Sequence, residues 1–210
     1  DPFNEFASYE VFSSTALSGP YANIGSISSY TATSFTCSSC NANASPYYFF
    51  VQVKNMSTAL SPAIDTVKTM YLVFSSANSG VANLLWNDFH FPLPAGESSF
   101  YKIWREFPTS IWTQIATKPV QTTSSAYYYY SDTIAICSDS INYRVELYDP
   151  ILLCTSVSNV RGGNFVDATS PFAPSLDSVS VNSSGQVVIG IHPSYSQDVK
   201  CFVIYNYQSG

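Results

Sequence analysis

The sequence predicts an all-β protein: a single-domain antiparallel β-sandwich or barrel with long loops and at most one or two short helices. Ser and Thr supply 50 of the 210 residues, and another 33 are Phe, Trp or Tyr. With 8 Lys or Arg and 14 Asp or Glu, the chain has far fewer charges than the quarter that is usual in soluble proteins. About ten strand-like segments follow at intervals of roughly 8–15 residues, which is typical of a sandwich or barrel.

The N-terminal part has the weakest pattern. Residues 1–45 are rich in Ser, Thr, Ala and Gly with single aromatic residues, which predicts a loop-rich edge segment. The nearly continuous apolar run at 47–54 predicts a strand that is buried on both faces. Residues 61–68 are the one helix candidate, because Ser61 suits an N-cap and Pro62 the first helical position.

The middle of the chain predicts a series of strands. Their ranges are 69–74, 81–86, 88–91, 101–106, 111–116, 127–137, 143–147 and 151–157. The proline-rich stretch 92–96 is expected to be a loop.

The C-terminal part begins after a break. Gly and Pro residues at 159–175 predict an irregular connection, with Arg161-Gly162-Gly163 as a loop tip. A hairpin should follow, with 179–181 paired to 187–191 across a turn that ends in Gly185. A last strand is expected at 199–207. No internal repeat is evident. Because only two or three strands follow the break, they are expected to complete the same sheet, which gives one domain of residues 1–210.

The charge pattern and the length of the apolar runs exclude nucleic acid and membrane insertion, respectively. The net charge is −6, and the eight basic residues are scattered along the chain, so no cluster exists that could bind a nucleic-acid backbone. The longest apolar run is strand-sized, which predicts no membrane insertion. The chain begins with Asp1 and not with Met, and is therefore expected to be a fragment or a processed product.

The five cysteines, an odd number, leave the redox state open. The pair in Cys37-Ser38-Ser39-Cys40 has the spacing of zinc and redox motifs, but no second ligand pair or βαβ setting accompanies it. A local disulfide is one alternative, and free thiols are favoured. Cys137, Cys154 and Cys201 lie in apolar strand-like runs and are expected to be buried thiols.

Three Asn-x-Ser sequons occur, at Asn43, Asn55 and Asn182. Pro46 directly follows the first and makes it a poor acceptor. Asn55 and Asn182 are therefore the candidate glycosylation sites, provided that the protein is secreted.

No catalytic constellation is evident. The two histidines, His90 and His192, have no accompanying nucleophile motif. The acids that border strands are Glu97, Glu106, Asp132, Glu146 and Asp149, and they are expected to be ordinary strand-end carboxylates. The sequence thus predicts a protein that is not an enzyme and that holds no metal or cofactor.

Binding residues are better supported. The run Tyr127-Tyr128-Tyr129-Tyr130 in a strand places two phenols on each face. Either one pair is exposed for binding or both pairs pack between layers. We take Tyr128, Tyr130, Arg161 and Trp112 as binding candidates, although the tryptophans Trp86, Trp104 and Trp112 also suit a core.

In size, acidic charge, Ser/Thr/Tyr-rich strands such as 122–130 and absence of a basic arm, the chain resembles the capsid spike domains of astroviruses. Astroviruses are small non-enveloped viruses. The resemblance to their spike domains implies a non-catalytic projection on the virion surface that mediates attachment to host cells. It also implies a homodimer, a host receptor of protein or glycan, and neutralising antibodies as partners.

Two alternatives stay open. One is a secreted carbohydrate-binding or adhesion module of a microbial surface, which glycans at Asn55 and Asn182 and an oxidised Cys37–Cys40 pair would favour. The other is a secreted hydrolase, which would need a deep cleft where acids converge.

Overall fold

The computed structural model describes residues 5–63, 65–77, 80–88, 99–121, 127–134, 138–150, 153–166, 170–196, 199 and 201–205. These residues form fourteen strands and no helix. The strand pairs are antiparallel and lie in four sheets. The predicted all-β class is therefore confirmed.

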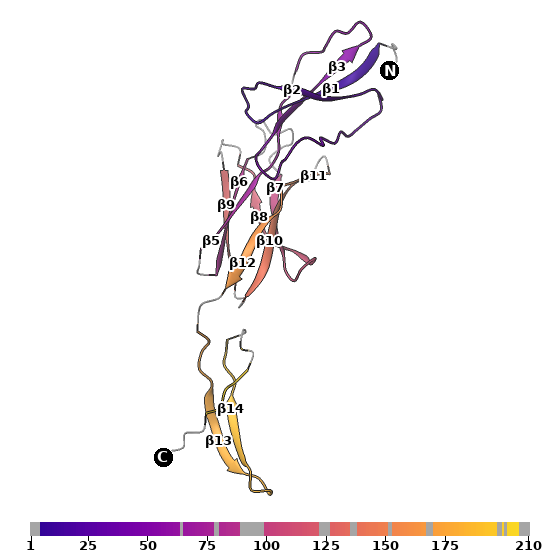
Figure 1. Ribbon diagram of the computed structural model, residues 1–210. Coiled ribbons are helices and arrows are strands. Elements are labelled where there is room, and N and C mark those ends of the chain that lie inside the picture. The colour runs from indigo at the N-terminus through magenta and orange to yellow at the C-terminus, as the bar shows by residue number, and fades with distance from the viewer. Residues whose placement is uncertain are drawn as a thin grey trace.

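Two of the sheets pack face to face. The first, sheet B, has the order β5 (Leu72–Ala77), β6 (Val81–Asn87), β9 (Tyr127–Thr133). The second, sheet C, has the order β11 (Cys154–Val157), β10 (Ser138–Asp149), β7 (Phe100–Glu106), β8 (Trp112–Pro119), and β12 (Arg161–Val166) also pairs with β10. Figure 1 shows the two layers in the middle of the molecule, and together they form the predicted sandwich.

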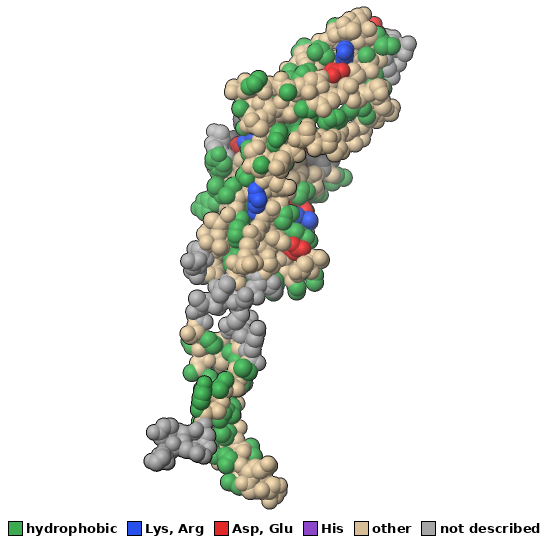
Figure 2. Space-filling model, viewed as in Figure 1, with side chains coloured by type: hydrophobic (Ala, Val, Ile, Leu, Met, Phe, Trp, Pro, Cys, Tyr) green, Lys and Arg blue, Asp and Glu red, His purple; other side chains and the backbone are tan. Residues whose placement is uncertain are grey.

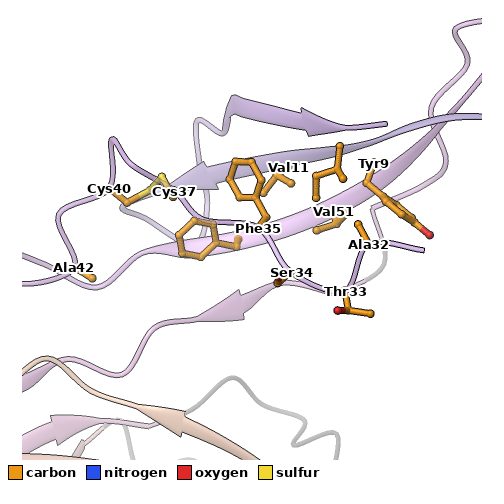
Figure 3. Close-up of a pocket in the computed structure, with 12 residues that line it drawn as sticks. Tyr9, Val11, Ala32, Thr33, Ser34, Phe35, Cys37, Cys40, Ala42 and Val51 are labelled. Atoms are coloured by element: carbon orange, nitrogen blue, oxygen red, sulfur yellow. A yellow bond between two sulfur atoms is a disulfide. The ribbon is translucent and has the colours of Figure 1, made fainter. Parts of the chain in front are cut away.

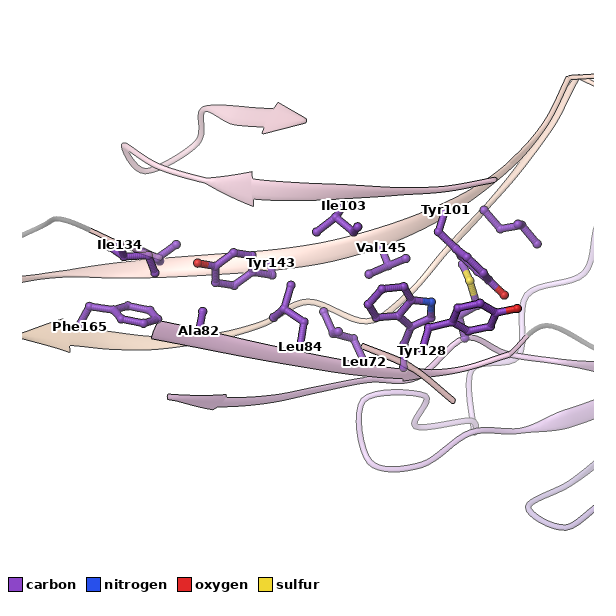
Figure 4. Close-up of a cluster of buried hydrophobic side chains, with 14 residues drawn as sticks. Leu72, Ala82, Leu84, Tyr101, Ile103, Tyr128, Ile134, Tyr143, Val145 and Phe165 are labelled. Atoms are coloured by element: carbon purple, nitrogen blue, oxygen red, sulfur yellow. The ribbon is translucent and has the colours of Figure 1, made fainter. Parts of the chain in front are cut away.

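The core lies between these two sheets because their strands alternate inward apolar and outward polar residues. Trp86 is fully buried, stacks on Tyr128 with ring centroids 5.9 Å apart and meets Tyr101 edge-on at 5.6 Å. Figure 4 shows Tyr101 and Tyr128 meeting between the layers. The buried cluster comprises Met70, Leu72, Ala82, Leu84, Trp86, Tyr101, Ile103, Tyr128, Ile134, Ile141, Tyr143, Val145, Leu147 and Phe165.

One carboxylate is buried at the edge of this core. Asp132 Oδ2 accepts hydrogen bonds from Arg105 Nη1 at 3.0 Å and from the Tyr143 hydroxyl at 2.9 Å. Burial raises the pKa of the Tyr143 phenol, and the neighbouring Asp132 carboxylate raises it further. Asp132 thus links sheet B to two strands of sheet C.

A further sheet lies beside the sandwich. This sheet A has the order β2 (Ala22–Ile27), β1 (Phe6–Ser14), β3 (Tyr48–Asn55), β4 (Val67–Lys68). The strand predicted at 47–54 is confirmed as β3, but the expected burial on both faces is wrong, because Val51 and Val53 are 51% and 40% exposed. The segment predicted to be a loop-rich edge contributes β1 and β2, and long loops join them to the rest.

The helix predicted at 61–68 is wrong for the described residues of that range. Ser61 does not cap a helix: its Oγ accepts from the Val53 backbone N–H at 3.0 Å, and its own N–H donates to the Val53 carbonyl at 2.8 Å. Further along, Lys68 pairs with Tyr48. The open edge of β3 offers this segment backbone partners, and these override its local helix signals.

The C-terminal hairpin is confirmed as β13 (Ser175–Val181) and β14 (Val187–His192). Val179 pairs with Ile189 and Val181 with Val187, as predicted, and Gly185 takes a φ of 77°. The expectation that these strands complete the sheet before them is wrong, because β13 and β14 form a two-stranded sheet of their own. In Figure 1 the hairpin extends from the end of the sandwich opposite sheet A.

Two other expectations for the C-terminal part are also wrong. Residues 161–163 are not a loop tip, because Arg161 pairs with Tyr143 and Gly162 with Asn142 in the β10–β12 ladder. In the range 199–207, residues 199 and 201–205 are described and belong to no strand. No helix within the described ranges is long and apolar enough to cross a membrane.

Candidate binding site

The tyrosine run in β9 divides between two faces, as its alternation predicts. Tyr127 and Tyr129 are 60% and 69% exposed on the outside of sheet B, whereas Tyr128 is 4% exposed in the core. Tyr130 is half-buried and packs against the core. The alternative in which both pairs pack between layers is therefore wrong, and the outward pair is Tyr127 and Tyr129, not the predicted candidates Tyr128 and Tyr130.

Apolar side chains from the two neighbouring strands extend this surface. Across the sheet, Leu85 pairs with Val73 on one side and with Tyr129 on the other. Their side chains therefore lie in one row on the outer face, with Val73 43% and Leu85 40% exposed. We call Val73, Leu85, Tyr127 and Tyr129 the β5-β6-β9 face.

The ring of Tyr129 is held by a cation from the other sheet. Lys118 Nζ lies 4.4 Å from the ring centroid and donates a hydrogen bond to the Tyr129 carbonyl. A cation–π contact of this kind restricts the ring without removing it from solvent. The β5-β6-β9 face therefore presents an exposed aromatic surface on a fixed scaffold.

A cavity of about 670 Å³ adjoins this face, where β3 and β4 approach sheet B. Its lining combines aromatic, apolar and polar residues: Pro46, Tyr48, Lys68, Tyr71, Val73, Leu85, Trp86, Asn87, Asp88 and Tyr127. Three members, Val73, Leu85 and Tyr127, also belong to the β5-β6-β9 face. The cavity and the face are thus one continuous surface.

A partly buried ion pair lies in the wall of the cavity. Lys68 Nζ is 2.7 Å from Asp88 Oδ1, and the two side chains are 14% and 22% exposed. The Lys68 ammonium also lies 5.9 Å from the centroid of the Tyr48 ring. The pair offers both hydrogen-bond donors and acceptors while adding no net charge.

Asn87 fixes the segments that carry these groups. Its Oδ1 accepts from the Tyr71 backbone N–H at 2.7 Å, and its Nδ2 donates to the Thr69 carbonyl at 3.1 Å and to the Asp88 carbonyl at 2.8 Å. This buried side chain therefore uses most of its hydrogen-bonding capacity to position the chain on both sides of the cavity.

Arg161 contacts the cavity lining from β12. Its guanidinium donates to the Tyr71 hydroxyl at 3.2 Å and to the Asn43 carbonyl, and lies 5.7 Å from the centroid of the Tyr71 ring. The predicted candidate Arg161 is thus near the site, but it acts on Tyr71 and is not a mobile loop cation.

The predicted candidate Trp112 lies elsewhere, on the outer face of sheet C. The Arg144 guanidinium carbon is 4.5 Å from the centroid of the Trp112 ring and 5.5 Å from that of Trp104. Arg144 also pairs with Glu146 at 3.0 Å. Because the Trp112 ring is half-buried, it is a weaker candidate than the exposed tyrosines of β9.

A second cavity, of about 580 Å³, lies between sheet A and the loop after β2. Val11 and Val51 line it from β1 and β3, and Phe35 lines it from the loop (Figure 3). Cys37 and Cys40 also line it and form a disulfide. The favoured expectation of free thiols is therefore wrong for this pair, and the alternative of a local disulfide is correct.

The other predicted cysteine and glycan sites have mixed outcomes. Cys201 is a free thiol but is exposed, not buried. Cys137 lies outside the described residues, as does the side chain of Cys154. Asn55 is half-buried at the end of β3, its Oδ1 accepting from the Ala59 N–H at 2.8 Å, and Asn182 is exposed in the hairpin turn. Glycosylation of Asn55 and Asn182 stays a prediction.

The carboxylates considered for catalysis have structural partners in the described part of the chain. Besides the Asp132 and Glu146 pairs, Glu106 accepts from Asn142 Nδ2 and from the Ser110 N–H, each at 2.8 Å, and these bonds lower the pKa of its carboxyl. Within the described ranges no three His, Cys, Asp or Glu side chains form a group that could hold a metal. His90 and Glu97 lie outside those ranges.

Sequence reasoning missed the cavity. Lys68 and Asp88 are 20 residues apart, and only the pairing of β3 with β4 and of β5 with β6 brings them together. The outward position of Tyr127 and Tyr129 could have been inferred only by assigning Trp86 to the core, because Trp86 pairs with Tyr128.

No family model and no curated protein matches the chain. Among solved structures, one match is the chicken interferon gamma receptor alpha chain, with 11% identity, 75% of this chain and 84% of that chain covered, and a TM-score of 0.35. Another match is the FN1–FN3 domains of chicken CNTN1, with 15% identity, 91% of this chain and 67% of that chain covered, and a TM-score of 0.28. TM-scores this low do not establish a shared fold, so neither protein indicates what this chain does.

Proposed function

We propose that the chain is an extracellular, non-catalytic β-sandwich module that binds carbohydrate through the β5-β6-β9 face and the cavity beside it. The exposure of Tyr127 and Tyr129, at 60% and 69%, is the observation that carries this proposal. Large phenols so far from the core contribute little to stability where they lie, which favours a role in binding.

The chemistry of the face suits a sugar. Pyranose rings have apolar C–H faces that pack on aromatic rings, and the exposed Tyr127 and Tyr129 rings supply such surfaces. The hydroxyls around a sugar need several donors and acceptors in fixed positions, and the Lys68–Asp88 pair supplies them in the cavity wall. Figure 2 shows few charged side chains on the face in view, and they form no large patch of one sign.

The Cys37–Cys40 disulfide supports an extracellular location, because disulfides persist in oxidising compartments and are rare in the cytosol. Of the functions open from the sequence, the secreted carbohydrate-binding or adhesion module is therefore favoured. The virion projection, with its homodimer, host receptor and antibodies, stays a prediction on which none of the described contacts bears.

A glycan array probed with the labelled chain tests the proposal, followed by calorimetric titration of each glycan that binds. We expect Tyr127→Ala and Tyr129→Ala each to weaken binding at least about tenfold, a change of about 1.4 kcal/mol. Tyr195→Ala is the matched control, because Tyr195 is 92% exposed on the distant hairpin segment. Equal losses in all three variants, or binding of proteins only, would refute the proposal.

The location is tested separately by the intact mass of the chain after secretion from a eukaryotic host. We expect one disulfide, seen as a gain of two hydrogen atoms on reduction, and glycans on Asn55 and Asn182 that a glycosidase removes. A chain that is secreted fully reduced and without glycans would contradict the extracellular assignment.

A further inference from the structure

We call the cavity between sheet A and the loop after β2 the sheet A cavity; Val11, Val51 and Phe35 line it. Its volume of about 580 Å³ lies within the range of small-molecule sites. The cavity beside the β5-β6-β9 face has the Lys68–Asp88 ion pair in its wall, whereas the described residues that line the sheet A cavity carry no charge. An uncharged and largely apolar ligand therefore suits the sheet A cavity, because a charged ligand would find no partner in it.

The floor of this cavity is one face of sheet A. Val11 of β1 pairs directly with Val51 of β3, and Tyr9 pairs with Ile27 of β2. Paired residues point to the same face, as does Phe49, two residues before Val51. Val11 is 4% exposed and Val51 is 51% exposed, so the floor is apolar throughout but is open to water on its β3 side.

The loop after β2 forms the wall of the cavity. The Phe35 ring lies directly on Gly25 of β2, where a Cβ would come within 2.8 Å of the ring carbon Cζ. Glycine therefore lets the ring settle on the sheet. Further along the loop, the Cys37–Cys40 disulfide closes a turn that also lines the cavity. The contact at Gly25 fixes the loop to the sheet, and the disulfide stiffens the turn beside it.

The floor has the length of a medium hydrocarbon chain. Phe49 pairs with Ser13, which lies four residues from Tyr9 along β1. At the rise of a β-strand this span is about 13 Å. An extended hydrocarbon chain, with C–C bonds of about 1.5 Å, advances about 1.25 Å per carbon. A chain of about ten carbons therefore covers the floor from one end to the other.

Uncharged polar groups lie at one end of the cavity. Figure 3 shows Tyr9 and Thr33 at the end away from the Cys37–Cys40 disulfide. The Tyr9 hydroxyl donates to the Tyr30 carbonyl at 3.0 Å, which leaves its oxygen able to accept a hydrogen bond. The hydroxyl of the exposed Thr33 can donate or accept. This end therefore suits a neutral polar headgroup such as a hydroxyl.

We propose that the sheet A cavity binds a neutral, single-chain amphiphile. Its hydrocarbon chain lies over Val11 and Val51, and its polar head lies beside Tyr9 and Thr33. This site is separate from the carbohydrate site and does not depend on it, because its floor belongs to sheet A and not to sheet B. Each methylene group that leaves water for the cavity strengthens binding by about fourfold.

The test is a titration of the chain with straight-chain primary alcohols from hexanol to dodecanol, each below its solubility limit. We expect the affinity to rise about fourfold per methylene group up to about ten carbons, and then to level off because a longer chain extends beyond the floor. In NMR spectra of the unmodified chain with decanol, the shift changes should cluster at Tyr9, Val11, Phe35 and Val51.

Two matched substitutions separate this site from the carbohydrate site. Val51→Trp should weaken decanol binding at least about tenfold, because the indole fills the open side of the floor, and Val51 is exposed enough for the sheet to accept it. Val73→Trp is the matched control, since Val73 is 43% exposed and lines the other cavity. It should leave decanol binding unchanged and weaken only glycan binding, whereas Val51→Trp should leave glycan binding unchanged.

Several results would overturn the proposal. An affinity that keeps rising at the same rate through dodecanol would show adsorption to open apolar surface. Shift changes clustered on the exposed valines of β13 and β14 would show the same. Absence of decanol binding, or equal weakening of it by Val51→Trp and Val73→Trp, would also refute the site. Because glycan binding is measured on the same variants, a failure of this proposal is distinguishable from a failure of the carbohydrate site.

Discussion

At the scale of single residues, Asp132 is a buried polar group that connects the two sheets of the sandwich. It is 8% exposed and accepts hydrogen bonds from Arg105 and Tyr143, so that one carboxylate joins β9 to β7 and β10. A buried carboxylate is tolerated only with such partners.

Asp132→Ala should lower the free energy of unfolding by about 2–3 kcal/mol, because it leaves the Arg105 charge and the Tyr143 hydroxyl without their acceptor. Denaturant titration measures this change. Asp132→Asn retains an acceptor for both groups and should lower the free energy of unfolding by less than Asp132→Ala does. An equal decrease in both variants would show that the carboxylate charge, and not the hydrogen bonds, supplies the stabilisation.

Tyr143 should make the protein sensitive to alkali. Its folded-state pKa is raised by burial and by Asp132, so its contribution to stability is present below the usual pKa near 10 and is lost as the pH rises above that value. At pH 7, Tyr143→Phe should have a free energy of unfolding about 1 kcal/mol lower than that of the unmodified protein. Above a pH of about 10, the stability of this variant should fall less steeply with pH than that of the unmodified protein.

Thermal unfolding between neutral and alkaline pH measures this difference. Tyr129→Phe is the control, because Tyr129 is exposed, and it should keep the alkaline slope of the unmodified protein. If Tyr143→Phe keeps that slope too, the phenol does not cause the alkaline loss.

At the scale of elements, the outcome of sequence reasoning depended on whether a segment's neighbours could be inferred. The alternation within 127–130 and the pairs of the hairpin are local, and the sequence predicted both. Which tyrosines point outward depends on Trp86 in another strand, so the binding candidates were assigned to the wrong face. The helix prediction for 61–68 was wrong for the same reason: the segment pairs with the edge of β3, which lies far from it in sequence.

Gly162 shows how composition alone misleads. Arg161-Gly162-Gly163 has the composition of a loop, but a Cβ at Gly162 would overlap the Ile141 carbonyl and lie 2.7 Å from Asn142 Cα. Glycine is needed there for close approach of β12 to β10 and not for chain flexibility.

Gly162→Val should therefore destabilise the sandwich by about 2 kcal/mol through this overlap. Denaturant titration measures the loss. Asn164→Val, at an exposed position of the same strand, is the matched control and should change stability by less than about 0.5 kcal/mol. A similar loss in both variants would argue against the close approach.

The Cys37–Cys40 disulfide closes a short turn in the loop over sheet A, so it should fix that loop more than the whole fold. Replacing both cysteines with Ser should speed proteolytic cleavage within residues 28–46 and leave the unfolding of the sandwich unchanged. Reductant should reproduce the effect in the unmodified chain, and Cys201→Ser should not. Unchanged cleavage would show that packing alone holds the loop.

At the scale of the whole molecule, few charges and many exposed phenols and hydroxyls describe a surface that associates by stacking and neutral hydrogen bonds. The sandwich of sheets B and C is a rigid support, and it presents the β5-β6-β9 face to solvent on its outer side.

The most direct measurement is a residue-resolved NMR titration of the chain with an oligosaccharide identified on the array. We expect chemical-shift changes clustered at Val73, Leu85, Tyr127, Tyr129 and the Lys68–Asp88 pair, with an affinity that changes less than about threefold between low and high salt. Changes clustered on the outer face of sheet C or on the hairpin, or an affinity that falls steeply with salt, would contradict this expectation.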